Sequence, residues 1–243
     1  MIPMRGWYRE ITDLVLPVDC AGCGRARCTL CDECRAGLYG PGTVRRVRPD
    51  PVPPGLPPVH AAGVYEGSTR AVLLAHKERG ALRLAEPLGR ALAEAVRGVV
   101  GAEGRVGEGA PGAAPDPLFL VPVPSSPRST AARGHDPLRR IALRAARELR
   151  RHGVGAQVLP VLRQRRAVAD QAGLTASQRL ANLAGALGVV KGAERLLTSG
   201  WVVVVDDLLT TGASVVEAAR AVREAGGRVV GAAVVAVAEK TYG

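Results

Sequence analysis

Aromatic residues are scarce in this sequence of 243 residues. Phe, Trp and Tyr together make up 3% of the chain, whereas hydrophobic residues of all kinds make up 47%. The chain is long enough to bury a sizeable core, and with so few rings that core must be built from aliphatic side chains. Basic segments without interleaved aromatics also give no sign of a stacking platform for single-stranded nucleic acid.

Long apolar runs are missing as well. The longest apolar region, 229–238, is much shorter than the roughly 20 residues that a membrane-spanning helix needs. The first residues do not show a basic stretch followed by an apolar core and a small-residue cleavage site, which is the pattern of a secretory signal. We therefore expect a cytoplasmic protein with no membrane span.

Acidic residues are outnumbered by basic ones, 22 to 33, which gives a net charge of +11. Such a surplus favours anionic partners: phosphate, nucleic acid or an acidic protein surface. Arginines are densest in the segment from Leu138 to Arg166, where Glu148 is the only acid. This segment predicts either a nucleic-acid contact or a solvated helix face that funnels phosphate, and we favour the second.

All five cysteines lie between positions 20 and 34. Cys20 and Cys23 form one C-x-x-C pair, and Cys31 and Cys34 form a second. Clustered cysteines in a cytosolic chain indicate a metal, and two such pairs supply the four thiolates of a closed, structural zinc site. Cys28 also has C-x-x-C spacing to Cys31, but we expect it to be spare. The alternative is a redox-active or metal-free cluster.

The composition divides the chain into three parts. Residues 1–40 form the cysteine module, and residues 41–58 are rich in Pro, Gly and Arg, which predicts a stiff, extended linker. The main domain is expected to span 59–243. Within it, the Gly-, Ala- and Pro-rich segment 98–117 is predicted to be a mobile surface loop.

Apolar strands alternate with amphipathic helices in the main domain. Apolar runs at 118–123, 202–205 and 228–237 predict buried strands. Apolar residues three or four positions apart predict three helices, marked by Leu84, Leu88, Leu92 and Val96, by Leu138, Ile141, Ala145 and Leu149, and by Val215, Ala219 and Val222. This alternation is typical of an α/β fold with a mainly parallel sheet flanked by helices. Ligands of such sheets bind beyond the carboxyl ends of the strands.

The stretch VVVVDDLLTTGAS, at 202–214, lies at such a strand end. The carboxylates of Asp206 and Asp207 repel each other, and a sugar diol or a magnesium ion would compensate for this. The following loop, 210–214, offers hydroxyls and the N-terminus of a helix, which favours an anion, while Gly212 lets the backbone curl around a phosphate. The stretch therefore predicts a ribose 5-phosphate site. The sequence has no Walker phosphate loop, and no G-x-G-x-x-G loop follows this strand.

This stretch resembles the phosphoribosyl pyrophosphate signature of the type I phosphoribosyltransferases, and the order of motifs along nearly the whole chain is similar to that of the ComF family. The chain departs from that family at His135, Asp136 and Pro137, where an aromatic residue, Asn and Gln are usual. The shared motifs are the four-cysteine module, HKERG (76–80), the Pro-Val-Pro strand end (122–124), the Arg-Gly of RGHDP (133–137), the Arg-rich segment leading to Q-x-x-L (163–174), and R-x-x-N (179–182).

The resemblance implies a type I phosphoribosyltransferase-like fold with a small N-terminal zinc-binding module. It implies a glycosyltransferase of nucleotide metabolism that binds 5-phosphoribosyl 1-pyrophosphate with magnesium and transfers the phosphoribosyl group to a nitrogenous acceptor. Asp206, Asp207 and Lys77 would be the catalytic residues. The residues assigned to this substrate are Asp206, Asp207, Leu208, Leu209, Thr210, Thr211, Gly212, Ala213, Ser214, Lys77, Arg79, Gly80, Arg128 and Arg133.

The resemblance also implies an alternative. ComF-like proteins are associated with competence and the uptake of DNA, so the chain would instead be a non-catalytic protein that binds a phosphosugar, DNA or a DNA-processing protein. A homodimer is compatible with either activity. Segment 163–182 resembles the loop that covers the active site in phosphoribosyltransferases, where closure excludes water from a reactive donor.

Overall fold

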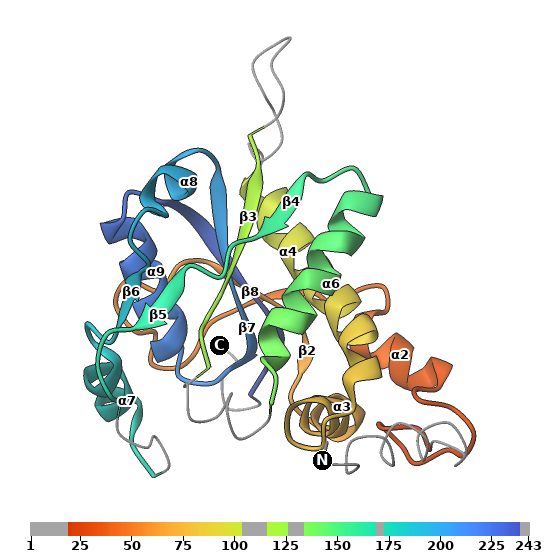
Figure 1. Ribbon diagram of the computed structural model, residues 1–243. Coiled ribbons are helices and arrows are strands. Elements are labelled where there is room, and N and C mark those ends of the chain that lie inside the picture. The colour runs from red at the N-terminus through yellow and green to blue at the C-terminus, as the bar shows by residue number, and fades with distance from the viewer. Residues whose placement is uncertain (1–18, 104–115, 126–133, 169–172, 239–243) are drawn as a thin grey trace, which may run out of the picture.

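A single twisted sheet organises the chain. The computed structural model describes residues 19–103, 116–125, 134–168 and 173–238. Six strands form the main sheet in the order β1-β2-β8-β7-β3-β4, and every neighbouring pair is parallel except β1 and β2 (Figure 1). The strands are β1 (Arg45–Val47), β2 (Val59–Val64), β3 (Leu118–Pro122), β4 (Ala156–Val158), β7 (Trp201–Leu209) and β8 (Arg228–Val237).

Helices cover both faces of this sheet. Five helical segments lie on one face (Figure 1): α2 (Asp32–Tyr39), α3 (Gly67–Glu78), the short 3₁₀ helix η1 (Leu82–Leu84), α4 (Ala85–Glu103) and α6 (Pro137–Arg151). The other face carries α7 (Ala176–Leu183), α8 (Glu194–Thr198), α9 (Ala213–Glu224) and a small antiparallel sheet of β5 (Leu162–Gln164) and β6 (Leu187–Val189). The expected mixed α/β architecture with a mostly parallel sheet is therefore confirmed.

Strand β7 contributes side chains to the hydrophobic cores on both faces of the sheet. Successive strand residues point to opposite faces of a sheet: Val203 and Val205 belong to the core under α4 and α6, and Val202 and Val204 to the core under α9. A strand buried on both faces needs a continuous apolar run. This requirement accounts for the row of valines in the sequence.

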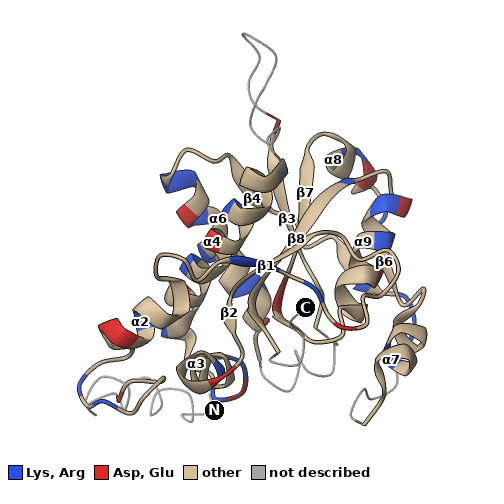
Figure 2. Cartoon of the chain, turned by 180° about the vertical axis from the view of Figure 1, so that it is seen from behind, with Lys and Arg blue, Asp and Glu red and all other residues tan. Residues whose placement is uncertain are grey.

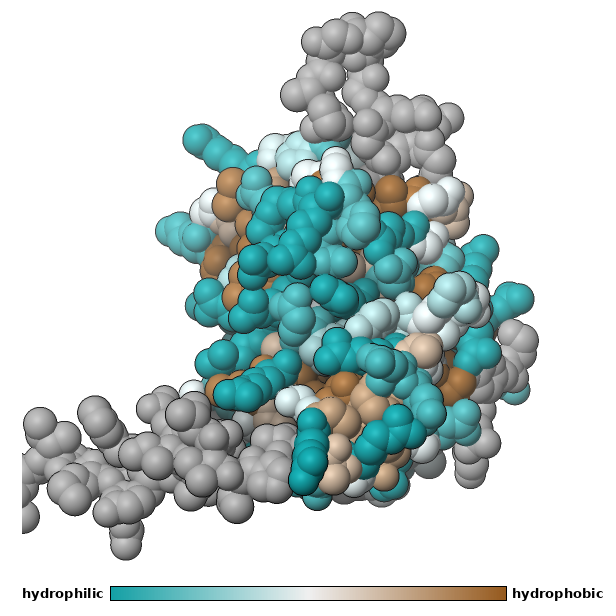
Figure 3. Space-filling view, turned by 90° about the vertical axis from the view of Figure 1, so that its right-hand side faces the viewer, coloured by the Kyte–Doolittle hydropathy of each residue, from teal (hydrophilic) through white to brown (hydrophobic). Residues whose placement is uncertain are grey.

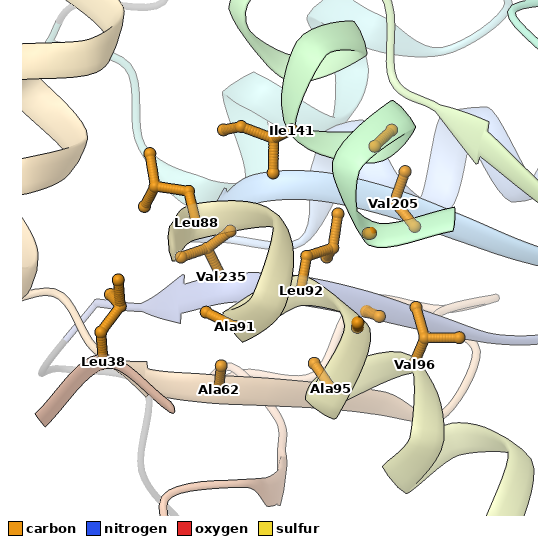
Figure 4. Packing of buried hydrophobic residues seen from close by; sticks show 14 of the residues in the cluster. Leu38, Ala62, Leu88, Ala91, Leu92, Ala95, Val96, Ile141, Val205 and Val235 are labelled. Atoms are coloured by element: carbon orange, nitrogen blue, oxygen red, sulfur yellow. The ribbon is translucent and has the colours of Figure 1, made fainter. Parts of the chain in front are cut away.

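The core is aliphatic, as the scarcity of rings predicted. Leu88 and Leu92 of α4 lie between Ile141 of α6 and Val235 of β8, Val96 lies one turn further along α4 (Figure 4), and all of these side chains are buried. Small residues let the layers approach closely. A Cβ at Gly89 of α4 would overlap the Cβ of an arginine on α6, so this glycine sets the spacing of the two helices.

The small sheet is attached to α9 by a buried carboxylate. Glu217 on α9 is 3% exposed and accepts a hydrogen bond from the Leu187 backbone N–H at 2.8 Å. Arg220 donates to it from one helical turn further on, at 2.8 Å. Burial raises the pKa of Glu217, but Arg220 and the backbone N–H groups of Leu187 and Gly185 outweigh that effect and hold this pKa below its ordinary value.

Two boundaries differ from the sequence prediction. Helix α4 continues to Glu103, six residues into the segment 98–117 that was predicted as a loop. Val99 continues the apolar stripe of α4 and is 1% exposed, while Gly98 fits closely against His60 of β2. These contacts keep the chain helical in spite of its glycines. Residues 104–115 of the predicted loop lie outside the described residues.

The segment 41–58 is more than an extended linker. Its residues 45–47 form strand β1, which pairs with β2 in antiparallel register, Val47 opposite Val59. The proline content of the segment predicts extended backbone, but it does not show that part of this backbone pairs with another strand. In the part of the chain that the structure describes, no helix combines the length and apolar character required to cross a membrane.

Candidate functional site

The candidate site lies where the direction of chain winding reverses. Strand β3 leads through α6 to β4 on one side of the sheet, whereas β7 leads through α9 to β8 on the other. The crevice between the carboxyl ends of β3 and β7 is where doubly wound sheets bind ligands. A cavity of about 270 Å³ opens there, lined by Lys77, Val123, Pro124, Ser125, Pro137, Leu138, Asp206, Asp207, Leu208, Thr210 and Ser214.

The two aspartates belong to β7 itself, because the strand continues to Leu209 rather than ending before them. Alternation along the strand places Asp207 on the same face as Val205, toward α3, and Asp206 on the opposite face. The Asp207 side chain is 13% exposed and accepts a hydrogen bond from Lys77 Nζ, on α3, at 2.7 Å. The fold thus joins residues that are 130 positions apart in the sequence.

Asp206 is electrostatically different from Asp207. Its Oδ1 accepts a hydrogen bond from the backbone N–H of Asp207 at 2.8 Å. Burial, and then the neighbouring Asp207 charge, raise the pKa of Asp206 well above its ordinary value, against the opposing effects of that N–H and of Lys77. The pair therefore favours hydroxyl or cation ligands that relieve its charge.

The loop that follows β7 presents a helix N-terminus to the cavity. Gly212 is the N-cap residue of α9, with φ of 77°, in the left-handed region that glycine tolerates best. It has no side chain to cap the helix, so the first-turn N–H groups can serve a bound anion. Ser214 and Thr210 line the cavity beside them. This geometry suits a phosphate group.

The proline-rich segment packs on this loop, which the sequence analysis missed. A Cβ at Gly212 would lie 3.1 Å from Leu56 Cδ1 and 3.3 Å from Pro53 Cγ. Arg223 on α9 holds the segment through a hydrogen bond to the Gly55 carbonyl oxygen at 3.1 Å. A second cavity of about 180 Å³ lies between the segment and the loop, lined by Pro49, Asp50, Pro51, Ala176, Thr210, Thr211 and Ala238. The available signal in the sequence was Leu56, an apolar residue among the prolines, which is partly buried against the core under α9.

The structure gathers only some of the residues assigned to the site. Lys77, Asp206, Asp207, Leu208, Thr210 and Ser214 line one cavity. Arg79 and Gly80 follow the end of α3 on the surface and do not line it. Leu209 and Ala213 are buried, and Thr211 lines the second cavity. Arg128 and Arg133 lie outside the described residues.

The unusual His-Asp-Pro sequence starts helix α6. Asp136 is the N-cap residue and accepts a hydrogen bond from the Arg139 N–H at 3.0 Å, and Pro137 takes the first helical position. His76 is fully buried between the helices, with Nε2 3.3 Å from the Pro137 carbonyl oxygen and Nδ1 3.2 Å from that of Ala81. Burial lowers the pKa of His76 despite these carbonyls. Asp136 thus fixes the start of α6, and His76 fixes the end of α3 against it; these two helix ends carry Pro137 and Lys77, which line the cavity.

The predicted cover segment, 163–182, contributes one contact to this region. It comprises the end of β5 and most of α7, and Ala176 at the start of α7 lines the second cavity. Thr175 caps α7, and its hydroxyl accepts from the Gln178 N–H in a reciprocal capping box. Residues 169–172 lie outside the described residues. Closure over the site stays a prediction.

The cysteine module forms the expected cluster of four cysteines, which could hold a zinc ion. The Sγ atoms of Cys20, Cys23, Cys31 and Cys34 all lie within 4.8 Å of one another. The Cys23 and Cys31 sulfurs are 3.6 Å apart, close to the edge of about 3.8 Å that Zn–S bonds of about 2.3 Å give in a tetrahedron. Cys28 lies outside this set, with Sγ 3.6 Å from the Arg25 carbonyl oxygen.

The thiols of the cluster differ in their surroundings. Burial raises the pKa of Cys20, but the backbone N–H groups of Cys31, Cys23 and Gly22 outweigh it and bring that pKa to about 6. Burial raises the pKa of Cys34, and its cysteine neighbours add to the effect. Four sulfurs crowded in this way fit a zinc ion, which would offset part of the thiolate charge and close the module.

Comparison of the chain with models of protein families and with curated proteins found no match to either. The likeness to ComF proteins therefore stays a prediction carried by the motifs. The same holds for DNA as a partner.

Proposed function

We propose that this protein binds 5-phosphoribosyl 1-pyrophosphate and transfers its phosphoribosyl group to a nitrogenous acceptor. The observation that carries the proposal is the meeting of three features at one strand end: the Asp206–Asp207 pair, Lys77 bonded to Asp207, and the glycine-capped start of α9. A phosphorylated sugar diol is the ligand whose groups match all three.

The proposed roles follow from the chemistry of each group. The carboxylates of Asp206 and Asp207 accept hydrogen bonds from the ribose hydroxyls, and the loop from Thr210 to Ser214 binds the 5-phosphate through N–H groups and hydroxyls. Lys77 lies within reach of the same carboxylate and offers positive charge to the departing pyrophosphate. An oxocarbenium-like transition state needs no covalent nucleophile from the protein, and none is assigned.

Magnesium would accompany the donor. Carboxylate oxygens are the ligands that this hard cation prefers, and Asp206 and Asp207 both line the cavity. The ion would neutralise charge on the pyrophosphate.

The test is calorimetric titration of the zinc-loaded protein with 5-phosphoribosyl 1-pyrophosphate and magnesium. The variant Asp207→Asn keeps the size of the side chain and removes the charge that Lys77 and the diol require. We expect its affinity to fall at least tenfold. The matched control is Asp116→Asn, just before β3 at the amino ends of the strands, where Asp116 forms an ion pair with Arg228 at 3.0 Å.

Equal affinity in wild type and Asp207→Asn would overturn the assignment of the diol to this site, as would absence of binding in the wild type. Turnover is measured separately, as pyrophosphate released when nucleobases or ammonia are added to the complex. Donor binding without release by any acceptor would favour the non-catalytic phosphosugar-binding alternative.

A further inference from the structure

A second surface feature lies on the sheet face opposite α9, away from the cavity at the strand ends. A groove of about 260 Å³ runs between η1, the start of α4 and the outer side of α6. Its floor is formed by Leu82, Ala85 and Leu143. Leu82 is 42% exposed and Leu143 is 51% exposed. Only four large hydrophobic side chains are that exposed among the described residues, and two of them meet in this groove.

Arginines surround this apolar floor. Arg140, Arg144, Arg147 and Arg150 line the groove, each about one helical turn after the last along α6. Arg144 is partly neutralised by a carboxylate of α4 at 3.5 Å, whereas Arg140 and Arg147 take part in no ion pair within the described ranges. Basic residues recur along α6 in Figure 2. Figure 3, which views this side of the molecule, shows hydrophilic side chains crowded over its middle, with apolar patches between them.

The groove is therefore more than a solvated helix face. The amphipathic pattern of α6 is satisfied by its buried side, which runs from Leu138 to Leu149, so Leu143 is not needed for the core. An exposed apolar patch rimmed by polar residues is typical of a protein-binding surface. The positive rim selects for negative charge in whatever binds there.

The chemistry of the floor favours a protein over nucleic acid. Single-stranded nucleic acids bind to proteins with their bases stacked on aromatic rings, and the lining contains none. Aliphatic side chains instead accommodate aliphatic side chains. A second copy of the chain is a poor occupant, because each copy carries a net charge of +11.

We propose that this groove is a docking site for an acidic segment of a partner protein, with aliphatic anchor side chains on Leu82 and Leu143 and carboxylates on the arginine rim. The proposal is independent of the phosphoribosyl site. A helix with apolar residues three or four positions apart fits such a groove, because those residues share one face.

The experiment uses the full, zinc-loaded protein and a labelled synthetic amphipathic peptide of Glu and Leu, followed by fluorescence anisotropy. The same peptide with Ser in place of Leu tests the apolar floor, and labelled oligodeoxythymidine tests nucleic acid. We expect the Glu–Leu peptide to bind, the Glu–Ser peptide to bind at least tenfold more weakly, and both affinities to fall as salt is added.

Two pairs of variants localise the binding. Leu143→Ser removes one of the two exposed leucines of the floor and should weaken binding of the Glu–Leu peptide about tenfold, whereas Leu196→Ser, at a side chain 50% exposed on α8, should not. The single variant Arg147→Glu should weaken binding of the Glu–Leu peptide more than Leu143→Ser does. Arg195→Glu on α8 is the matched charge control. Circular dichroism confirms that all four variants fold.

Three results would overturn the proposal. One is no binding of the Glu–Leu peptide. The second is an equal effect of Leu143→Ser and Leu196→Ser. The third is tighter binding of oligodeoxythymidine that Leu143→Ser leaves unchanged, which would assign the arginines to nucleic acid.

Discussion

Substituting Gly212 by alanine tests the candidate site and the proline-rich segment together. Gly212 has φ of 77°, and an L side chain in that region costs about 1–2 kcal/mol. The new Cβ would also lie 3.1 Å from Leu56 Cδ1 and 3.3 Å from Pro53 Cγ. The leucine tip can move, but the proline ring is stiff, so crowding should add about 1–2 kcal/mol.

Gly153 separates these two costs. It follows α6 with φ of 81°, and a Cβ there would have no neighbour within 4 Å. Gly153→Ala therefore carries the backbone strain alone, partly offset by the lower entropy of its unfolded chain. We expect it to lose about 1 kcal/mol, and Gly212→Ala to lose about 2–3 kcal/mol.

Urea denaturation of the zinc-loaded proteins measures both losses as shifts of the midpoint at unchanged slope. Titration with 5-phosphoribosyl 1-pyrophosphate then separates stability from function: Gly212→Ala should lose donor affinity, and Gly153→Ala should keep it. Equal destabilisation of the two variants would refute the packing of the proline-rich segment on the loop. Unchanged donor affinity in Gly212→Ala would refute the assignment of the loop to phosphate.

Three further predictions follow from the described contacts. Cys31→Ser should lower the zinc content well below one ion per chain by elemental analysis, while Cys28→Ser should leave it unchanged, because only the first belongs to the cluster; equal contents would contradict the ligand set. Glu217→Gln should cost about 1–3 kcal/mol in urea denaturation at neutral pH. Because the folded pKa of Glu217 is lowered, its contribution is complete above the ordinary value of 4.5 and is lost as the pH falls below it, so wild type and variant should converge in acid. A constant difference would contradict the pairing. Gly89→Ala should destabilise the protein, opposite to the usual gain of about 1 kcal/mol for this change inside a helix, because its Cβ would overlap α6; Gly101→Ala, whose Cβ would meet nothing within 4 Å, is the control in the same helix.

Local patterns in the sequence were enough to predict the three central strands of the sheet, β3, β7 and β8, but not β1, β2 and β4. The valine run predicts a strand buried on both faces, and each C-x-x-C pair predicts two thiolates in one tight turn. The structure contains both the strand and the cysteine cluster. The extent of β7 was less predictable. Asp206 and Asp207 disfavour a buried strand by composition, but at its carboxyl end they face a cavity rather than the core.

The contacts that complete the site are long-range, and local patterns do not encode them. Lys77 reaches Asp207 across 130 residues, and only the tertiary fold, which places the end of α3 near the carboxyl end of β7, brings them together. The proline-rich segment likewise prefers an extended backbone. An extended backbone is compatible with full solvation and also with the packing of Leu56 near Gly212 that the structure shows. The composition of the segment predicts its stiffness but not which residues it contacts.

Helix α3 connects the cysteine module to the candidate site. At its start, Ser68 lies beside Gly22, where a Cβ would be 2.7 Å from Cys34 Sγ and 3.0 Å from Ser68 Cβ. At its end, His76 contacts the first turn of α6 and Lys77 contacts Asp207. The cysteines and the middle of α3 share one hydrophobic cluster, so a module without its metal would lose the surface against which the helix packs. A zinc ion held by these four cysteines would have no open coordination position, and its effect on the candidate site would be indirect: through α3 it would fix where Lys77 lies beside Asp207.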